Sequence, residues 1–179
     1  GAVVFKSGKV IASGYHKQAG SHHAEIIALR KAGRKASGAD LYVNLEPCCH
    51  QGKTPPCTDS IIAAGIKRVV MGIRDPNQIV NGKGIHCLRK NGIEVVTGVL
   101  KRDCERLNES FLKYIRTGRP WVILKSALSL DGKIATRVGD SQWITGFKAR
   151  EYVHQLRNRV DAVLIGAGTV RSDDPRLTV

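Results

Sequence analysis

The sequence predicts an α/β protein with two consecutive domains, residues 1–117 and 121–179. Short runs of β-branched and aliphatic residues alternate with segments whose apolar residues recur at helical spacing. This alternation is typical of a mostly parallel sheet with helices packed on its faces. The stretch Thr117-Gly118-Arg119-Pro120 interrupts the pattern. The alternation then starts again at Trp121, which indicates a second α/β unit.

The first domain is expected to open with a β-hairpin formed by residues 2–5 and 10–15, which flank a Lys-Ser-Gly-Lys turn. Apolar runs predict further strands, and Gly33 and Gly65 are suited to end two of the predicted helices. The predicted strands are 41–45, 68–73 and 93–97, and the predicted helices are 23–32, 58–64, 84–90 and 101–114. The proline-rich stretch 47–57 between them is a loop.

The second domain shows fewer elements. Residues 121–128 and 161–168 have the apolar, β-branched composition of strands, and residues 147–158 have the pattern of an amphipathic helix. The chain begins with Gly1 inside a strand-like run and stops after Asp-Asp-Pro-Arg-Leu-Thr-Val without a closing element. We therefore expect a chain trimmed at both ends.

The composition limits the class of protein. Hydrophobic residues make up 42% of the chain, enough to bury a core, and no apolar run approaches the length of a transmembrane helix. The chain has five cysteines, an odd number that favours metal binding or catalysis over a disulfide framework. We expect a cytoplasmic protein with no membrane partner.

The chain is strongly basic, with 29 Lys and Arg against 15 Asp and Glu and a formal net charge of +14. Such charge suits nucleic acid or a phosphorylated small molecule, although a merely solvated basic face is an equally good explanation. Aromatic residues are only 5% and are not interleaved with arginines. This scarcity weakens the case for a surface that stacks nucleic-acid bases.

Three residues have the chemistry and order of zinc ligands. His23 begins a predicted helix, Cys48 follows a predicted strand, and Cys57 precedes another predicted helix. A helix N-terminus favours a thiolate, and three N and S ligands leave one coordination position open for catalysis. A single histidine is more often a cap or core residue, but the ordered set predicts a Zn²⁺ site. Cys49 is a competing ligand, although the Pro-Cys position favours Cys48.

Glu25 lies two residues after His23, and such residues do not share a helix face. It is therefore a poor fourth ligand and a better general base beside a water whose pKa zinc lowers to about 7. His-x-Glu followed by Pro-Cys-x-x-Cys is the signature of zinc deaminases, in which the glutamate moves the proton. Here eight residues separate Cys48 from Cys57, which argues against an editor of nucleic-acid bases. Two alternatives stay open: such a nucleic-acid base deaminase, and a structural zinc module in which Glu25 only favours the helix start.

The longer motifs resemble one family. HAE, LEPCCHQGKTPPC, RVVMGIRDPN, LKSALSLDGKIAT, SQWITG and GAGTVRSDDPRLT are together similar to the bifunctional riboflavin-biosynthesis deaminase/reductase family of the RibD type. The resemblance covers essentially the whole chain. It departs at Cys49, where the family usually has serine, and at Gln78, where proline is common. It implies a cytidine-deaminase-like three-layer α/β/α domain followed by the start of a dihydrofolate-reductase-like α/β domain.

The resemblance also implies two activities. The first is zinc-dependent hydrolytic deamination of 2,5-diamino-6-(5-phosphoribosylamino)pyrimidin-4(3H)-one, with Zn²⁺ on His23, Cys48 and Cys57 and with Glu25 as proton donor and acceptor. The second is NADPH-dependent reduction of the product's ribosyl side chain to ribityl. We expect this reductase half to be incomplete here, the protein to be a homo-oligomer, and nucleic acid not to be a partner. The implied reductase residues are NADP contacts at Ala127, Trp143, Thr169 and Asp173 and substrate contacts at Ser141, Arg157 and Leu177.

Overall fold

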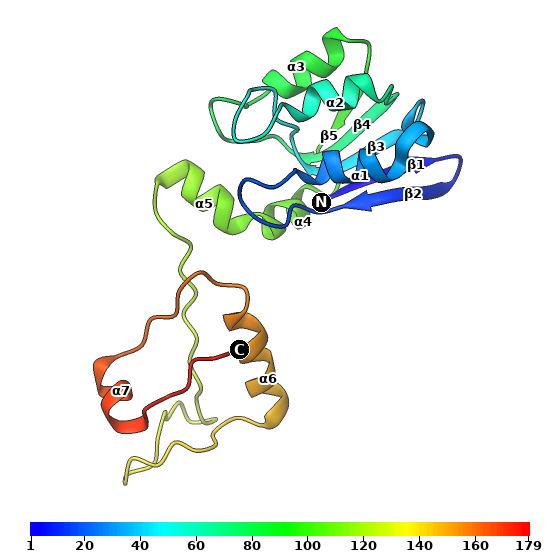
Figure 1. Cartoon of the computed structure of the whole chain (residues 1–179). Coiled ribbons are helices and arrows are strands. Elements are labelled where there is room, and N and C mark those ends of the chain that lie inside the picture. Colours follow the sequence, from blue (N-terminus) through cyan, green and yellow to red (C-terminus); the bar gives the residue numbers. More distant parts are fainter. The chain divides into compact units, whose positions relative to one another are not determined.

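The computed structural model describes residues 1–179, which divide into two units, Gly1–Val122 and Ile123–Val179. All five strands and most of the helices belong to the first unit (Figure 1). The second unit has two helices joined by segments without regular structure. None of the helices is both long and apolar enough to cross a membrane.

The strands form one mixed sheet in the order β2-β1-β3-β4-β5. Their bounds are β1 Ala2–Lys6, β2 Lys9–Gly14, β3 Asp40–Leu45, β4 Arg68–Ile73 and β5 Glu94–Thr97. β1 runs antiparallel to both β2 and β3, whereas β3, β4 and β5 are parallel. The predicted hairpin is present, and the predicted parallel arrangement holds for β3, β4 and β5, whereas β1 also pairs antiparallel with β3, which was not predicted.

The helices of the first unit connect these strands. They are α1 Ala24–Ala32, the short 3₁₀ helix η1 Gly33–Ala36, α2 Cys57–Ala63, α3 Lys83–Lys90, α4 Lys101–Leu107 and α5 Glu109–Thr117. The predicted single helix 101–114 is two helices that meet at Asn108. The Asn108 side-chain amide donates a hydrogen bond to the carbonyl of Cys104 at 2.8 Å. Asparagine often competes with the helical backbone in this way, which accounts for the break.

The core lies between the sheet and its helices. Leu41, Val69 and Met71 of the strands and Ile61 and Leu88 of the helices are fully buried. Helix α4 packs against β4 at Gly72, where an added Cβ would lie 2.1 Å from the Cys104 sulfur. Neighbouring residues of a strand point to opposite faces, so Met71 faces away from α4. The sheet thus has helices on both faces, as the three-layer prediction requires.

The second unit departs from the predicted strands. Helix α6, Phe147–Arg157, matches the predicted helix, but residues 121–128 have no strand, and α7, Ala167–Asp173, follows residues 161–166 that have none either. A strand needs a hydrogen-bonded neighbour, and these segments pair with none. The apolar side chains that a sheet would bury are exposed; Leu124 is 92% exposed and Leu164 98%.

Candidate metal centre

The three predicted zinc ligands converge at one end of the sheet. Their ligand atoms lie within 4.8 Å of one another, and no other Asp, Glu, His or Cys joins the group. His23 Nδ1 is 3.6 Å from the Cys48 sulfur and 3.3 Å from the Cys57 sulfur. His23 immediately precedes α1, Cys48 follows the end of β3, and Cys57 is the first residue of α2. A strand end and two helix starts therefore deliver the three side chains.

The cluster perturbs the protonation of its members. The pKa of Cys48 is lowered to about 4, first because the Cys57 thiol donates a hydrogen bond to its sulfur and then because of the His23 ring. The Cys57 backbone N–H also donates to that sulfur at 3.3 Å. The hydrogen bond with Cys48 raises the pKa of His23 in turn, and the same kind of contact raises the pKa of Cys57. The environment thus favours a thiolate at Cys48.

The donor set fits zinc. One imidazole nitrogen and two sulfurs are ligands that Zn²⁺ prefers, and three protein ligands are the number found in catalytic rather than structural sites. Cys57 is fully buried, whereas His23 and Cys48 are half-buried and line a pocket. The open side of the cluster therefore faces the pocket. The competing thiol of Cys49 is not in the group, and burial raises its pKa.

Glu25 lies beside the cluster but not within it. It is the second residue of α1, its side chain is buried, and burial raises the pKa of its carboxyl. The charge of its carboxyl contributes to the raised pKa of Cys57, and Glu25 follows the His23 ligand by two residues. A carboxyl held near ligand atoms without being one of them is suited to carry a proton.

The pocket beside the cluster has a volume of about 320 Å³. The His16 ring stands edge-on to the His23 ring, with centroids 5.2 Å apart, and His16 Nδ1 lies 3.2 Å from the carbonyl of His22. The side chain of His22 is not part of the His-Cys-Cys cluster, and only its backbone carbonyl contacts His16. The other lining residues include His50, Lys53 and Thr54 of the loop between the two cysteines.

Sequence reasoning missed two of these residues. His16 lies in the loop between β2 and α1 and belongs to none of the sequence motifs. Only the fold brings its ring to the ring of His23. Lys53 is the only Lys or Arg between Cys48 and Cys57. Its place inside a ligand loop was a signal that the sequence offered. The structure also places His50, from the same loop, in the pocket wall.

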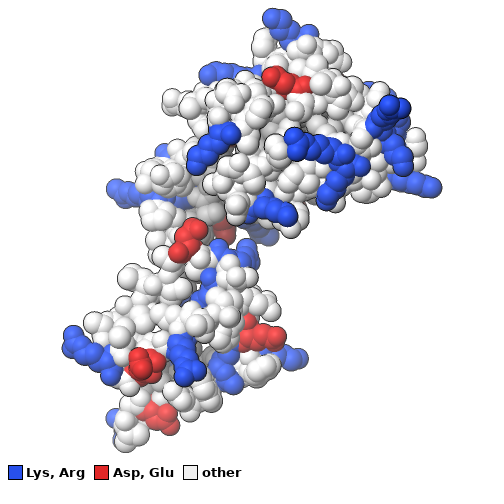
Figure 2. Space-filling model, in the orientation of Figure 1, with Lys and Arg blue, Asp and Glu red and all other residues white.

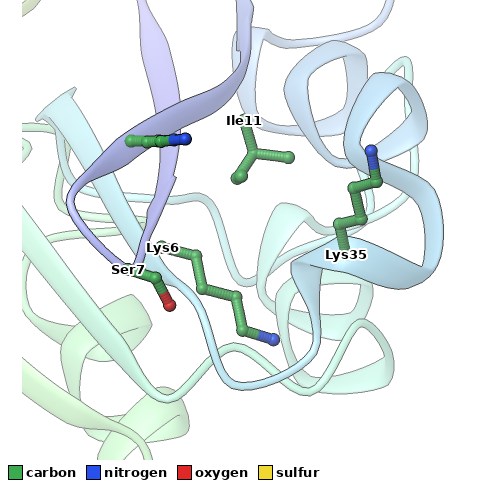
Figure 3. Close-up of a pocket in the computed structure, with 5 residues that line it drawn as sticks. Lys6, Ser7, Ile11 and Lys35 are labelled. Carbon is green, nitrogen blue, oxygen red and sulfur yellow. The ribbon is translucent and has the colours of Figure 1, made fainter.

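A second hollow, of about 390 Å³, lies at the turn of the β-hairpin (Figure 3). Its lining residues are Lys6, Ser7, Lys9, Ile11 and Lys35. The turn adjoins the start of β3, since Phe5 pairs with Asp40, whereas Cys48 follows the end of β3. This basic hollow therefore lies near the start of β3, whereas the His-Cys-Cys cluster lies beyond the end of the same strand.

The expected reductase residues are spread over the second unit, and neither hollow includes any of them. Trp143 is 68% exposed, with the Arg150 guanidinium 4.4 Å from its ring centroid. Thr169 and Asp173 lie on α7, and Ala127 and Ser141 lie in segments without regular structure.

Arg157 and Leu177 do lie together. Arg157, the last residue of α6, donates hydrogen bonds to the carbonyls of Arg176 at 3.3 Å and Thr178 at 3.2 Å, the two residues that flank Leu177. The guanidinium expected to bind substrate thus also ties the C-terminal segment to α6.

Comparison with known proteins assigns both parts of the chain. Residues 1–73 match the family model described as the cytidine and deoxycytidylate deaminase zinc-binding region, and residues 120–179 match the RibD C-terminal domain. The chain is 55% identical to riboflavin biosynthesis protein RibD of Aquifex aeolicus over 100% of its own length and 50% of that protein. It is 50% identical to the Escherichia coli protein of the same name, again over 100% of this chain and 49% of the relative. The chain thus spans about half the length of the curated relatives it matches.

A solved structure agrees with these matches. The diaminohydroxyphosphoribosylaminopyrimidine deaminase/5-amino-6-(5-phosphoribosylamino)uracil reductase of Thermotoga maritima has a TM-score of 0.91 and 52% identity, covering 97% of this chain and 50% of that one. The predicted fold class is confirmed: a cytidine-deaminase-like zinc-binding domain is followed by part of a dihydrofolate-reductase-like domain of the NADPH-binding type. The chain therefore belongs to the RibD family of riboflavin biosynthesis proteins.

Proposed function

We propose that this chain is a zinc aminohydrolase that deaminates 2,5-diamino-6-(5-phosphoribosylamino)pyrimidin-4(3H)-one. One observation carries the proposal: His23, Cys48 and Cys57 meet at a pocket, with the buried Glu25 carboxyl beside them. We assign the three residues as zinc ligands and Glu25 as the proton donor and acceptor. Membership of a family with a deaminase half supports this assignment.

Bound zinc would supply a water of lowered pKa that acts as the nucleophile at neutral pH. Glu25 would accept a proton from the attacking water and donate it to the exocyclic amine. The new C–O bond replaces the C–N bond, and the amine leaves as ammonia. Burial raises the pKa of Glu25, so its carboxylate is a stronger base than that of an ordinary glutamate, and more of it is protonated near neutral pH and available to donate to the amine.

The pocket has groups that suit a phosphorylated substrate. Lys53 is exposed at the pocket, and the rings of His16 and His50 line it. An ammonium group supplies a point charge and three donors to a phosphate, and imidazoles donate to phosphate or to the pyrimidine. These side chains support a phosphoribosyl substituent as part of the substrate.

We further propose that the chain divides functionally into a deaminase domain, residues 1–117, and the N-terminal part of an NADPH-dependent reductase domain, residues 121–179. The reductase would convert the ribosyl side chain of the deaminated product to ribityl. The match of residues 120–179 to the RibD C-terminal domain supports this division. We assign NADP contacts to Ala127, Trp143, Thr169 and Asp173 and substrate contacts to Ser141, Arg157 and Leu177.

The compartment and assembly state are also proposals. All five cysteines are free thiols, which suits a reducing compartment, so we propose a cytoplasmic enzyme. Exposed apolar side chains on α4 and α5, among them Leu107 at 69% and Tyr114 at 59%, support a homo-oligomer.

A nucleic-acid base deaminase is the second candidate, which the net charge of +14 favours. Figure 2 shows Lys and Arg side chains scattered over the visible face, with Asp and Glu side chains between them, rather than gathered into one stripe. On this face, such scatter gives a nucleic-acid backbone no continuous track.

The two candidates differ in substrate and in salt dependence. The zinc-loaded chain is offered the phosphoribosylamino-diaminopyrimidine, cytidine or a single-stranded RNA, and ammonia is measured. We expect release from the diaminopyrimidine alone, and RNA binding that is weak at physiological salt. Release from RNA, with an affinity that falls steeply with salt, would replace our proposal with the second candidate.

A further inference from the structure

Glu46 is a buried carboxylate that the metal chemistry does not use. It follows β3 directly, two residues before Cys48, and only 4% of it is exposed. No Lys, Arg or His pairs with it, since the ion pairs of the chain are elsewhere. A buried charge without a counterion is costly unless hydrogen bonds compensate it. Its location beside a ligand loop therefore calls for an explanation.

Three backbone N–H groups provide that compensation. Glu46 Oε2 accepts from the N–H of Asp75 at 3.2 Å and of Gly82 at 3.0 Å, and Oε1 accepts from the N–H of Ile85 at 3.1 Å. Two of the donors lie at the start of α3, where unsatisfied N–H groups and the helix dipole both favour a carboxylate. One side chain thus holds both ends of the segment 74–85, which contains no strand.

The backbone around Glu46 also holds segment 74–85 against the start of the loop 47–57, which carries Cys48 and Cys57. The backbone N–H of Glu46 donates to the carbonyl of Ile73 at 3.0 Å, and an added Cβ at Gly84 would lie 2.2 Å from the carbonyl oxygen of Pro47. Helices α2 and α3 are in contact and lie side by side in Figure 1. The segment therefore has no room to move toward Cys48, and Glu46 keeps it from moving away.

Asp75 is the first residue of segment 74–85 that Glu46 holds. It is 7% exposed, and its carboxylate accepts the Asn77 N–H at 2.8 Å. His50 lines the pocket, and its Nδ1 is buried without a partner. Segment 74–85 therefore backs the loop that carries Cys48 and His50, through the close approach of Gly84 to Pro47.

We infer that Glu46 is a positioning residue, which fixes segment 74–85 behind the loop that carries Cys48 and His50, two residues that line the substrate pocket. It acts on the substrate through the segment and touches neither metal nor substrate itself. The expected change in KM rests on the proposed deaminase function. The expected change in hydrogen exchange of residues 74–85 rests on the geometry alone.

The test is Glu46→Gln, which keeps the size of the side chain. An amide NH₂ must then face either the Ile85 N–H or the N–H groups of Asp75 and Gly82, donor against donor. We expect faster hydrogen exchange over residues 74–85, unchanged zinc content, and a KM for the diaminopyrimidine raised about tenfold with kcat changed less than about threefold. Glu94→Gln, the same change on an exposed strand residue, is the matched control and should alter none of these.

A residue that only stabilises the fold would lower the melting temperature and leave KM and the local exchange unchanged, and that result overturns the inference. If Glu46→Gln does not fold, Gly84→Ala carries the test, because it pushes the same segment away from Pro47 and should raise KM likewise. Should the wild-type chain release no ammonia, the proposed function fails. The exchange of residues 74–85 then decides the role of Glu46 independently: unchanged exchange in the variant contradicts it.

Discussion

Two adjacent cysteines, Cys48 and Cys49, differ in chemistry because of what surrounds each sulfur. Both are partly buried, yet the pKa of Cys48 is lowered to about 4 by hydrogen bonds from Cys57 and His23, while burial raises the pKa of Cys49. The difference in pKa between the two thiols cannot be predicted from the spacing of residues along the chain. It depends on the folded position of α2, whose first residue donates to the Cys48 sulfur.

This difference predicts a selective reaction. In the metal-free chain at pH 5, the thiolate fraction of Cys48 exceeds that of Cys49 by more than about a thousandfold. The lower nucleophilicity of an acidic thiolate offsets about a hundredfold of this. Iodoacetamide should therefore modify Cys48 about ten times faster than Cys49, as measured by tandem mass spectrometry. Faster modification of Cys49 would contradict the assigned environment.

The ligand assignment predicts loss of metal. His23→Ala and Cys57→Ser should each weaken zinc affinity by more than about a hundredfold, because each removes a direct ligand. The neighbouring changes His22→Ala and Cys49→Ser are matched controls, since neither side chain belongs to the cluster. Zinc content after dialysis against a chelating buffer measures the effect. Full occupancy in His23→Ala would show that the metal binds elsewhere.

The sequence predicts the residues that would carry the chemistry, but not the side chains that surround them. His23, Glu25, Cys48 and Cys57 follow a pattern whose residue types and order are tied to one reaction, so they could be proposed from the sequence, and the structure brings the three expected ligands together. His16 was not, because its edge-on contact with His23 arises from the path of the loop after β2. Arg157 was expected to bind substrate, and its hydrogen bonds to the carbonyls around Leu177 were not foreseeable from its side-chain type.

Among the elements, all five strands of the first unit lie within one residue of their predicted bounds, whereas the two strands predicted in the second unit are absent. The amphipathic pattern of α6 is a local property, and its structure follows the predicted range to within one residue at its C-terminal end. Residues 121–128 have the composition of a strand, but a strand forms only when a neighbour pairs with it, which no local pattern specifies. The antiparallel placement of β1 against β3 was missed for the same reason.

The contact between β4 and α4 predicts a sensitive glycine. Gly72→Ala places a methyl group 2.1 Å from the Cys104 sulfur and 2.7 Å from its Cβ, and should reduce the free energy of unfolding by about 1–3 kcal/mol. Urea unfolding measures this loss. Adding Cys104→Ala removes the nearer atom, so the double variant should recover part of the stability that Gly72→Ala loses. No recovery would mean that α4 does not pack on Gly72.

For the whole molecule, zinc is expected to link separate parts of the first unit. His23 and Cys57 are 34 residues apart in the sequence and come from the starts of α1 and α2. A ligand that binds only the folded state stabilises it, by about 4 kcal/mol when present at a thousand times its dissociation constant.

Removal of the metal should therefore lower the melting temperature of residues 1–122 by several degrees and leave the helices of residues 123–179 unchanged. Calorimetry with and without a chelator measures the first part. Hydrogen exchange of α6 in the same samples measures the second. An equal loss in both units, or none in the first, would contradict a zinc site confined to the first unit.

The central claim is that zinc on His23, Cys48 and Cys57 and a proton carried by Glu25 together deaminate a phosphorylated pyrimidine. The most direct measurement is ammonia release by the zinc-loaded chain from the phosphoribosylamino-diaminopyrimidine, beside Glu25→Gln at equal zinc content. Our account predicts steady release by the wild-type chain and a loss of at least about a hundredfold in the variant, in which the substrate still binds. Equal release by the two proteins would show that Glu25 carries no proton and would contradict the account.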